Sequence, residues 1–180
     1  MADRATQVMR RFDAAELSFC VQLNRACARR GVREFFSAIS RLGDGVFWYA
    51  LMLVLPILFG DLGRQAALQM AATGLVGVAL YKGLKRTLVR ERPFISDARI
   101  RLAMAPLDRY SFPSGHTLHA VSFTILASAY FPEFAVLLVP FAALVAASRV
   151  LLGLHYPTDV LAGAVLGTVL STLSLYFVGV

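Results

Sequence analysis

Charged residues are scarce in this sequence. They make up 16% of its 180 residues, whereas 58% are hydrophobic, and there are only 11 acidic residues against 18 Lys and Arg. A water-soluble domain with a single core needs more polar surface than this composition supplies. The shortage of charge therefore argues against a soluble protein and indicates one that lies in a membrane.

Cysteine is almost absent, and so is any N-terminal segment of continuous apolar residues. The two cysteines, Cys20 and Cys27, would lie two turns or about 10 Å apart on one continuous helix, which is too far for a disulfide. The first ~44 residues alternate apolar and basic positions. A secretory signal peptide is therefore not expected, and the cysteines say nothing about the redox compartment.

Five uncharged apolar runs follow this N-terminal region. Each has roughly the ~17–25 residues that a membrane-spanning helix needs, or slightly fewer. They cover residues 45–60, 65–81, 110–132, 134–148 and 160–180. We predict an all-α polytopic membrane helical bundle with about five transmembrane helices over residues 45–180. An amphipathic interfacial segment over residues 1–44 precedes it.

The basic residues gather on one predicted face of the membrane. With five spans, 17 of the 18 Lys and Arg residues fall on the face of the N-terminus, and Arg64 alone lies opposite. The positive-inside rule makes that face cytoplasmic. We expect anionic lipids as partners and no nucleic acid, because the basic residues are not interleaved with exposed aromatics on a soluble domain.

Two polar clusters lie close to the predicted ends of spans. In "KRTLVRERP", Lys85 and Arg92 would lie two turns apart on one helical face before Pro93 ends it, so that both could hold one anion or form a basic collar. In "PSGH", Ser114 can cap the next helix, whose free N–H groups bind anions. His116 then lies in its first turn, either as a catalytic group or as a histidine at the headgroup level.

A third cluster, "SRVLLGLHYPTD", places Arg149 at the end of one span and Asp159 at the start of the next. Ionisable residues inside a bilayer are costly and usually functional. Asp159 is close enough in sequence to orient His155 and leave its other nitrogen free to attack; the alternative is a capping aspartate beside a structural histidine. Together the three clusters have the composition expected for phosphoryl transfer without a metal.

These motifs resemble the type 2 phosphatidic acid phosphatase (PAP2) superfamily of membrane lipid phosphate phosphatases. Its pattern is Lys, six residues, Arg-Pro; then Pro-Ser-Gly-His; then Ser-Arg, five residues, His, three residues, Asp, and all three parts stand intact in residues 85–159. The resemblance implies that His155 is a nucleophile forming a phosphohistidine, that Asp159 orients it and that His116 is the general acid. It also implies no metal or other cofactor, with the phosphate oxygens bound by Lys85, Arg92, Ser114, Gly115 and Arg149.

By this resemblance we expect a lipid phosphatase in the bacterial inner membrane, with undecaprenyl diphosphate as the first candidate substrate. Phosphatidylglycerophosphate, phosphatidic acid and lipid-to-lipid phosphotransfer stay open. Bacterial relatives favour a site on the outer face, against the charge count. A zinc hydrolase using His116, His119 and His155, a haloperoxidase and a non-enzymatic scaffold that binds anionic lipid are the rival hypotheses. The sequence does not specify the oligomeric state.

Overall fold

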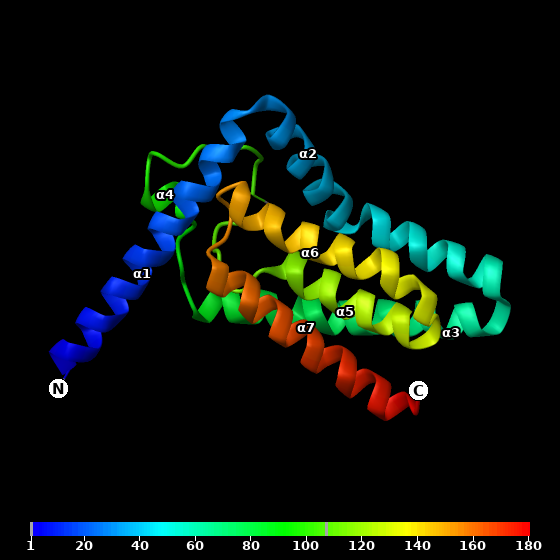
Figure 1. Ribbon diagram of the computed structural model, residues 1–180. Coiled ribbons are helices and arrows are strands. Elements are labelled where there is room, and N and C mark those ends of the chain that lie inside the picture. Colours follow the sequence, from blue (N-terminus) through cyan, green and yellow to red (C-terminus); the bar gives the residue numbers. More distant parts are fainter. Residues whose placement is uncertain (1, 107) are drawn as a thin grey trace.

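The computed structural model describes residues 2–106 and 108–180, with side chains from Asp13 onward, and this part of the chain contains helices and loops but no strand (Figure 1). A π-helical turn, η2 (Leu42–Val46), precedes the long helix α3. Short 3-10 turns cover Arg25–Ala28 and Pro132–Phe134. The helices are α1 (Ala2–Asn24), α2 (Arg30–Arg41), α3 (Phe47–Thr87), α4 (Pro93–Ser96), α5 (Gly115–Tyr130), α6 (Ala135–Leu151) and α7 (Pro157–Val178).

Helix α3 is a hairpin of two arms. It reverses at Gly60, whose φ of 57° and ψ of −129° suit a residue without a Cβ, and the second arm folds back beside the first (Figure 1). The arms pack closely next to the reversal, where a Cβ on Gly63 would lie 2.0 Å from the carbonyl oxygen of Leu55. The predicted spans 45–60 and 65–81 are thus the two arms of one interrupted helix.

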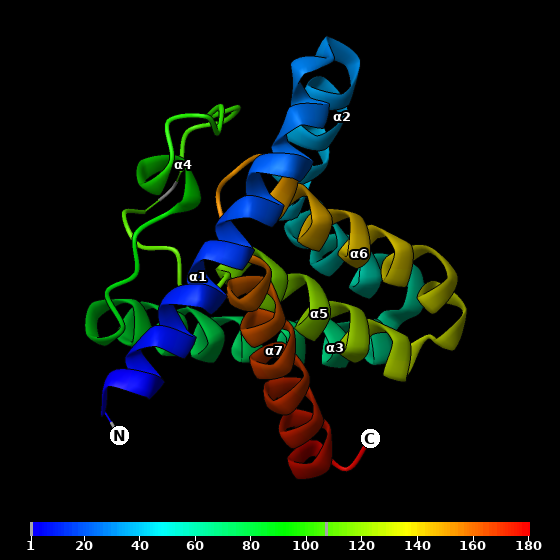
Figure 2. The same ribbon diagram turned by 60° about the vertical axis from the view of Figure 1, so that its left-hand side comes forward.

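Three helical stretches are long and apolar enough to cross a membrane, namely residues 30–87, 132–151 and 157–178. The first contains both arms of α3, and α5 is shorter at 16 residues. Successive helical segments run in opposite directions and lie next to one another, namely the two arms of α3, then α5, α6 and α7 (Figures 1 and 2). The expectation of an all-α membrane helical bundle is confirmed.

Helix α5 occupies the centre of the bundle and packs against α3, α6 and α7. Two glycines bring α7 against its backbone: a Cβ on Gly163 would lie 2.4 Å from the Ser114 carbonyl oxygen, and one on Gly167 would lie 2.5 Å from that of Leu118. Small residues at four-residue spacing permit such close helix packing. The contact fixes the N-terminus of α5 relative to the start of α7.

The N-terminal segment lies across the loop end of the bundle, where α1 passes α4 and the start of α7 (Figure 2). Cys20 lies in α1 and Cys27 in the following 3-10 turn, so the expectation of one continuous helix is wrong. The α-helix ends at Asn24, whose side-chain amide donates to the carbonyl oxygens of Arg101 (3.1 Å) and Leu151 (2.9 Å). Both thiols are free and buried.

Candidate active site

The three motifs meet at one end of the bundle, around a cavity of about 430 Å³. Two predicted site residues, Ser114 and Asp159, do not line this cavity; both are fully buried behind it. The other predicted residues all line it: Lys85, Arg92, Gly115, His116, Arg149 and His155. The fold therefore brings together the full predicted set from segments that lie up to 74 positions apart in the sequence.

Arg92 does not share a helical face with Lys85, so that expectation is wrong. The helix α3 ends at Thr87, and Arg92 has an extended conformation with φ −83° and ψ 153°. The physical reason is Pro93, whose ring disfavours a helical conformation at the preceding residue. The loop nevertheless returns the guanidinium to the ammonium group of Lys85, through a carboxylate that both contact.

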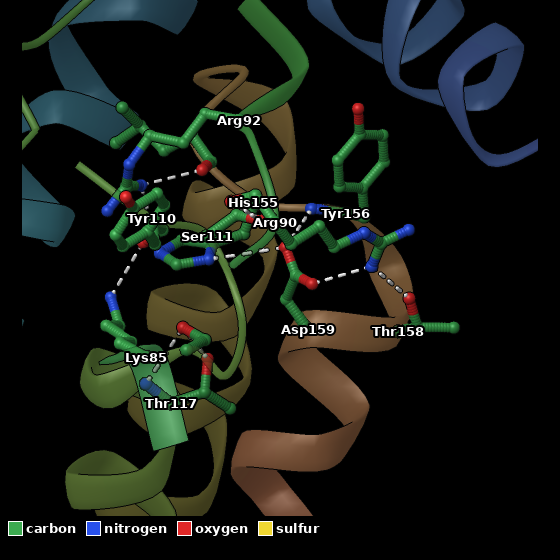
Figure 3. Close-up of polar contacts among 12 residues, drawn as sticks. Lys85, Arg90, Arg92, Tyr110, Ser111, Thr117, His155, Tyr156, Thr158 and Asp159 are labelled. Carbon is green, nitrogen blue, oxygen red and sulfur yellow. Dashed lines mark hydrogen bonds and ion pairs between the residues drawn. The ribbon is translucent and has the colours of Figure 1, made fainter. Parts of the chain in front are cut away.

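That carboxylate belongs to Asp108, which the sequence motifs do not include. Lys85 Nζ donates to its two oxygens at 2.7 and 2.8 Å. The same Nζ donates to the Tyr110 carbonyl oxygen at 3.0 Å (Figure 3). Arg92 Nη2 donates to Oδ1 at 2.6 Å. Burial raises the pKa of Asp108, but its bonds with Lys85 and the charges of Lys85 and Arg92 outweigh this effect and lower it. An ionised carboxylate thus lies where these cations could hold a phosphate.

His155 lies in the turn between α6 and α7, with Asp159 on one side and Arg92 on the other (Figure 3). Its Nδ1 is 3.5 Å from Asp159 Oδ2, and its Nε2 is 3.3 Å from Arg92 Nη1. Burial first, and then the positive charges of Arg149, Arg92 and Lys85, lower the pKa of His155 well below its usual value. The imidazole is therefore neutral at neutral pH, as a nucleophile requires.

Asp159 is held mainly by groups other than His155. Its Oδ2 accepts from the backbone N–H of Tyr156 at 2.8 Å, and its Oδ1 accepts from Arg90 Nη1 at 2.7 Å (Figure 3). Pro157 opens α7, as predicted, and places Asp159 in the first turn. Arg90 is a second positioning group that the spacing of the motif did not single out, although it lies inside "KRTLVRERP".

His116 lies in the first turn of α5, with Nε2 3.0 Å from Oδ1 of Asp44. Asp44 comes from η2, and its only signal in the sequence is an acid between two glycines beside an apolar run.

Arg149 is 1% exposed, and its Nη1 donates to the Ser40 hydroxyl. Among the described residues, Trp48 Nε1 and Arg149 Nε are buried nitrogens of cavity-lining residues that form no hydrogen bond. Such donors suit a ligand rich in acceptor oxygens.

Ser114 caps α5 as predicted, because its Oγ accepts from the Thr117 N–H at 3.5 Å. Its own N–H donates to the carbonyl oxygen of Asp159 at 3.0 Å, which ties the start of α5 to the start of α7. A Cβ on Gly115 would meet the Tyr81 ring at 3.3 Å, so this position lies tightly against the second arm of α3. The first turn of α5 thereby presents its N-terminal end to the cations and histidines.

The cavity has an apolar end that continues between the arms of α3 and towards α5. Its wall there consists of Trp48, Met52, Leu75, Val78 and Phe123. One end therefore carries cations and histidines and the other carries hydrocarbon. A molecule with a phosphate headgroup and an apolar chain matches that division.

His119, the third residue of the zinc hypothesis, is engaged elsewhere. Its Nε2 is 3.1 Å from the Gly74 carbonyl oxygen, and its ring stacks on Phe123 at a centroid distance of 5.3 Å. Within the described part of the chain, no group of three or more His, Cys, Asp and Glu side chains is arranged to hold a metal ion. The three histidines do not form the ligand set that this hypothesis requires.

A protein family and several known proteins resemble this chain in sequence. The model described as the PAP2 superfamily matches residues 63–180. The undecaprenyl-diphosphatase of Sulfolobus acidocaldarius is 28% identical over 162 residues, which are 89% of this chain and 76% of that protein. The decaprenylphosphoryl-5-phosphoribose phosphatase of Mycolicibacterium smegmatis is 32% identical over 136 residues, covering 75% of this chain and 73% of that protein.

A solved structure shares the arrangement of helices. The crystal structure of Aquifex aeolicus LpxE superposes with a TM-score of 0.78 at 26% sequence identity, covering 89% of this chain and 94% of that one. The similarity thus extends beyond the motifs to nearly the whole bundle.

Proposed function

Because this chain belongs to the PAP2 superfamily, we propose that it is a membrane lipid phosphatase that works through a covalent phosphohistidine at His155. The observation that carries the proposal is the position of this imidazole. Its Nδ1 faces Asp159 at 3.5 Å, and its Nε2 faces a cavity lined by Lys85, Arg92 and Arg149. A neutral nucleophile among three cations suits attack on a phosphoryl group.

In the first half of the reaction, the Nε2 lone pair of His155 attacks phosphorus. The P–N bond forms as the bond from phosphorus to the leaving oxygen breaks, and His116 gives that oxygen a proton. Lys85, Arg92 and Arg149 neutralise the negative charge on the phosphoryl oxygens. Asp159 keeps the ring in its orientation and stabilises the positive charge that it gains.

In the second half, water attacks the phosphohistidine. His116, now neutral, takes a proton from the water; the P–N bond breaks, and inorganic phosphate leaves with His155 restored. The backbone N–H groups at the start of α5, at Gly115 and His116, bind phosphoryl oxygens beside the cap Ser114. Positioning and charge supply the catalysis, and no metal is needed.

A lipid with a terminal phosphate or diphosphate is the proposed substrate. The apolar end of the cavity, between the arms of α3, supports a hydrocarbon chain next to the phosphate site. The names of the two relatives, an undecaprenyl-diphosphatase and a decaprenylphosphoryl-5-phosphoribose phosphatase, support a polyprenyl chain. Undecaprenyl diphosphate is our first candidate, ahead of phosphatidylglycerophosphate and phosphatidic acid.

The chain is a membrane protein, and we propose where its two parts lie. Residues 45–180 form the catalytic bundle, which crosses the bacterial inner membrane several times. Residues 1–44 lie along the membrane surface and contact anionic lipid through their arginines. Bacterial origin is supported by the mycobacterial relative and by the similarity to the Aquifex structure.

The test is phosphate release by the purified protein in detergent with excess EDTA, on undecaprenyl diphosphate, phosphatidylglycerophosphate and phosphatidic acid. We expect release from one of these lipids, its loss in His155→Ala, and a ³²P-labelled, acid-labile phosphoenzyme in the wild type only. Size-exclusion profiles and unfolding curves serve as controls that the variant is folded.

Two outcomes would reject the proposal: no release from any lipid, or release that His155→Ala retains. Loss of activity in EDTA, restored by zinc, would favour the metal hydrolase instead. Phosphate that appears on an added lipid alcohol and not in water would identify a phosphotransferase with the same covalent intermediate.

A further inference from the structure

The sequence Gly43-Asp44-Gly45 forms a tight turn just before α3. It lies in the π-helical turn η2, and Gly45 has a φ of 124°, which favours glycine. Gly43 is buried, and a Cβ there would lie 2.7 Å from Val145 Cγ2 of α6. Gly43 thus allows the close approach to α6, Gly45 allows the positive φ, and Asp44 between them lines the cavity.

Asp44 directs its carboxylate at the general acid that the mechanism requires. Its Oδ1 lies 3.0 Å from His116 Nε2, and the imidazole is 9% exposed. Burial, and then the buried cation Arg149 of the same cavity, oppose a positive charge on that ring. A nearby carboxylate favours the imidazolium form, which a general acid must have before it can give up a proton.

The other carboxylates around the site are engaged elsewhere. Asp108 is bonded to Lys85 and Arg92, and Asp159 is bonded to Arg90. Within the described residues, Asp44 forms an ion pair with His116 and with no other side chain. It is therefore the carboxylate available to hold a proton on His116.

We propose that Asp44 is a positioning residue for leaving-group protonation: it fixes the ring of His116 and stabilises the protonated form of that ring as the bond to phosphorus breaks. One nitrogen of the imidazolium, Nε2, lies beside Asp44, and the other gives its proton to the departing oxygen. The attacking water later returns the proton to His116. The site thus has two histidine–carboxylate pairs, one for attack and one for departure; this inference rests on the proposed function.

The test compares two substrates with equal tails and different leaving groups. Dodecyl phosphate releases an alkoxide that needs a proton, and 4-dodecyl-2-nitrophenyl phosphate releases a stable phenolate. We measure kcat/KM, which reports the steps up to the phosphohistidine. Asp44→Asn should lower it by about 10²-fold or more for the alkyl ester and by less than about 10-fold for the aryl ester. A merely structural defect would lower both alike.

Matched variants sharpen the result. His116→Ala should show the same dependence on the leaving group, and the double variant should lose little more than either single one, because the two residues act as a unit. Asp44→Glu should recover part of the alkyl activity. Asp61→Asn, a surface change with a side chain that is 92% exposed, should leave both activities unchanged.

The burst of nitrophenolate from the aryl ester counts the folded active sites, so partial misfolding of Asp44→Asn would not disguise the result. Equal losses for both esters, or no loss for either, would overturn the role of Asp44. His155→Ala separates this failure from failure of the proposed function. If His155→Ala still turns over the aryl ester, the proposed phosphohistidine is wrong. If His155→Ala is inactive and the leaving-group test has failed, the proposed function stands and only the inference about Asp44 is rejected.

Discussion

At the scale of single residues, two of the proposed phosphate-binding cations are already hydrogen-bonded to a carboxylate. Asp108 accepts from Lys85 and Arg92 at 2.6–2.8 Å. A carboxylate and a phosphate present similar oxygens to such donors. Since these cations hold the pKa of Asp108 below its usual value, the group is ionised at neutral pH and competes with an incoming phosphate.

This competition predicts that Asp108→Asn binds phosphate analogues more tightly. A neutral amide is a weaker partner for Lys85 and Arg92, so that an anion displaces it at lower cost. We expect the inhibition constant of orthovanadate to fall by about tenfold, corresponding to about 1.4 kcal/mol. Asp97→Asn, the same change at a residue that pairs with exposed Arg99 on the same loop, should leave inhibition unchanged. Weaker inhibition in Asp108→Asn would show that this carboxylate supports the site.

At the scale of elements, helix α1 is joined to the catalytic turn through one acid. Glu16, 7% exposed, accepts from the Thr158 N–H at 2.8 Å and from its hydroxyl at 2.9 Å. It also accepts from Arg90 Nη2 at 2.7 Å, and Arg90 Nη1 donates to Asp159. The N-terminal helix therefore supports the carboxylate that orients His155, and α1 is coupled to the active site.

We expect Glu16→Gln to weaken both stability and turnover. The amide would turn an N–H₂ group towards donors, leaving buried polar groups unpaired, which costs about 1–3 kcal/mol. Chemical unfolding in detergent should show a drop of that size in the free energy of unfolding, and kcat should fall as Asp159 loses support. Glu133→Gln, an exposed site at the opposite end of the bundle, is the control. Unchanged stability and kcat in Glu16→Gln would mean that α1 does not support the turn that carries His155 and Asp159.

At the scale of the whole molecule, the charges divide between the two ends of the bundle. The loop that follows α3, the turn between α6 and α7, and α1 lie at one end; the reversal of α3 and the turn between α5 and α6 lie at the other (Figure 1). The first end carries nearly all Lys and Arg residues. The positive-inside rule therefore predicts a cytoplasmic active site, although some of these cations serve the phosphate.

Cysteine labelling tests this orientation. Arg64→Cys and Arg99→Cys replace side chains that are 68% and 71% exposed at opposite ends, while the native thiols are buried. A membrane-impermeant maleimide should label Arg64→Cys in intact cells and Arg99→Cys only after lysis. The reverse pattern would place the active site outside and show that the basic residues serve substrate binding rather than topology.

The sequence by itself determined the class of protein and most of the candidate site. Apolar runs of nearly spanning length predict a membrane bundle, because hydrocarbon demands internally bonded helices. The three motifs predict the histidines, the cations and Asp159, because their spacing is local and each group lies at a helix end. Two expectations that relied on helical continuity, at Arg92 and at Cys27, failed where the chain leaves the helix.

Only the tertiary structure decided which partners these residues have. Asp44 meets His116 across 72 positions, Glu16 meets Thr158 across 142, and Asp108 returns from a loop to Lys85 and Arg92. No local spacing encodes such pairs. They depend on how the arms of α3, the central α5 and the glycines of α7 pack, and that packing determines which carboxylate lies beside which cation or histidine.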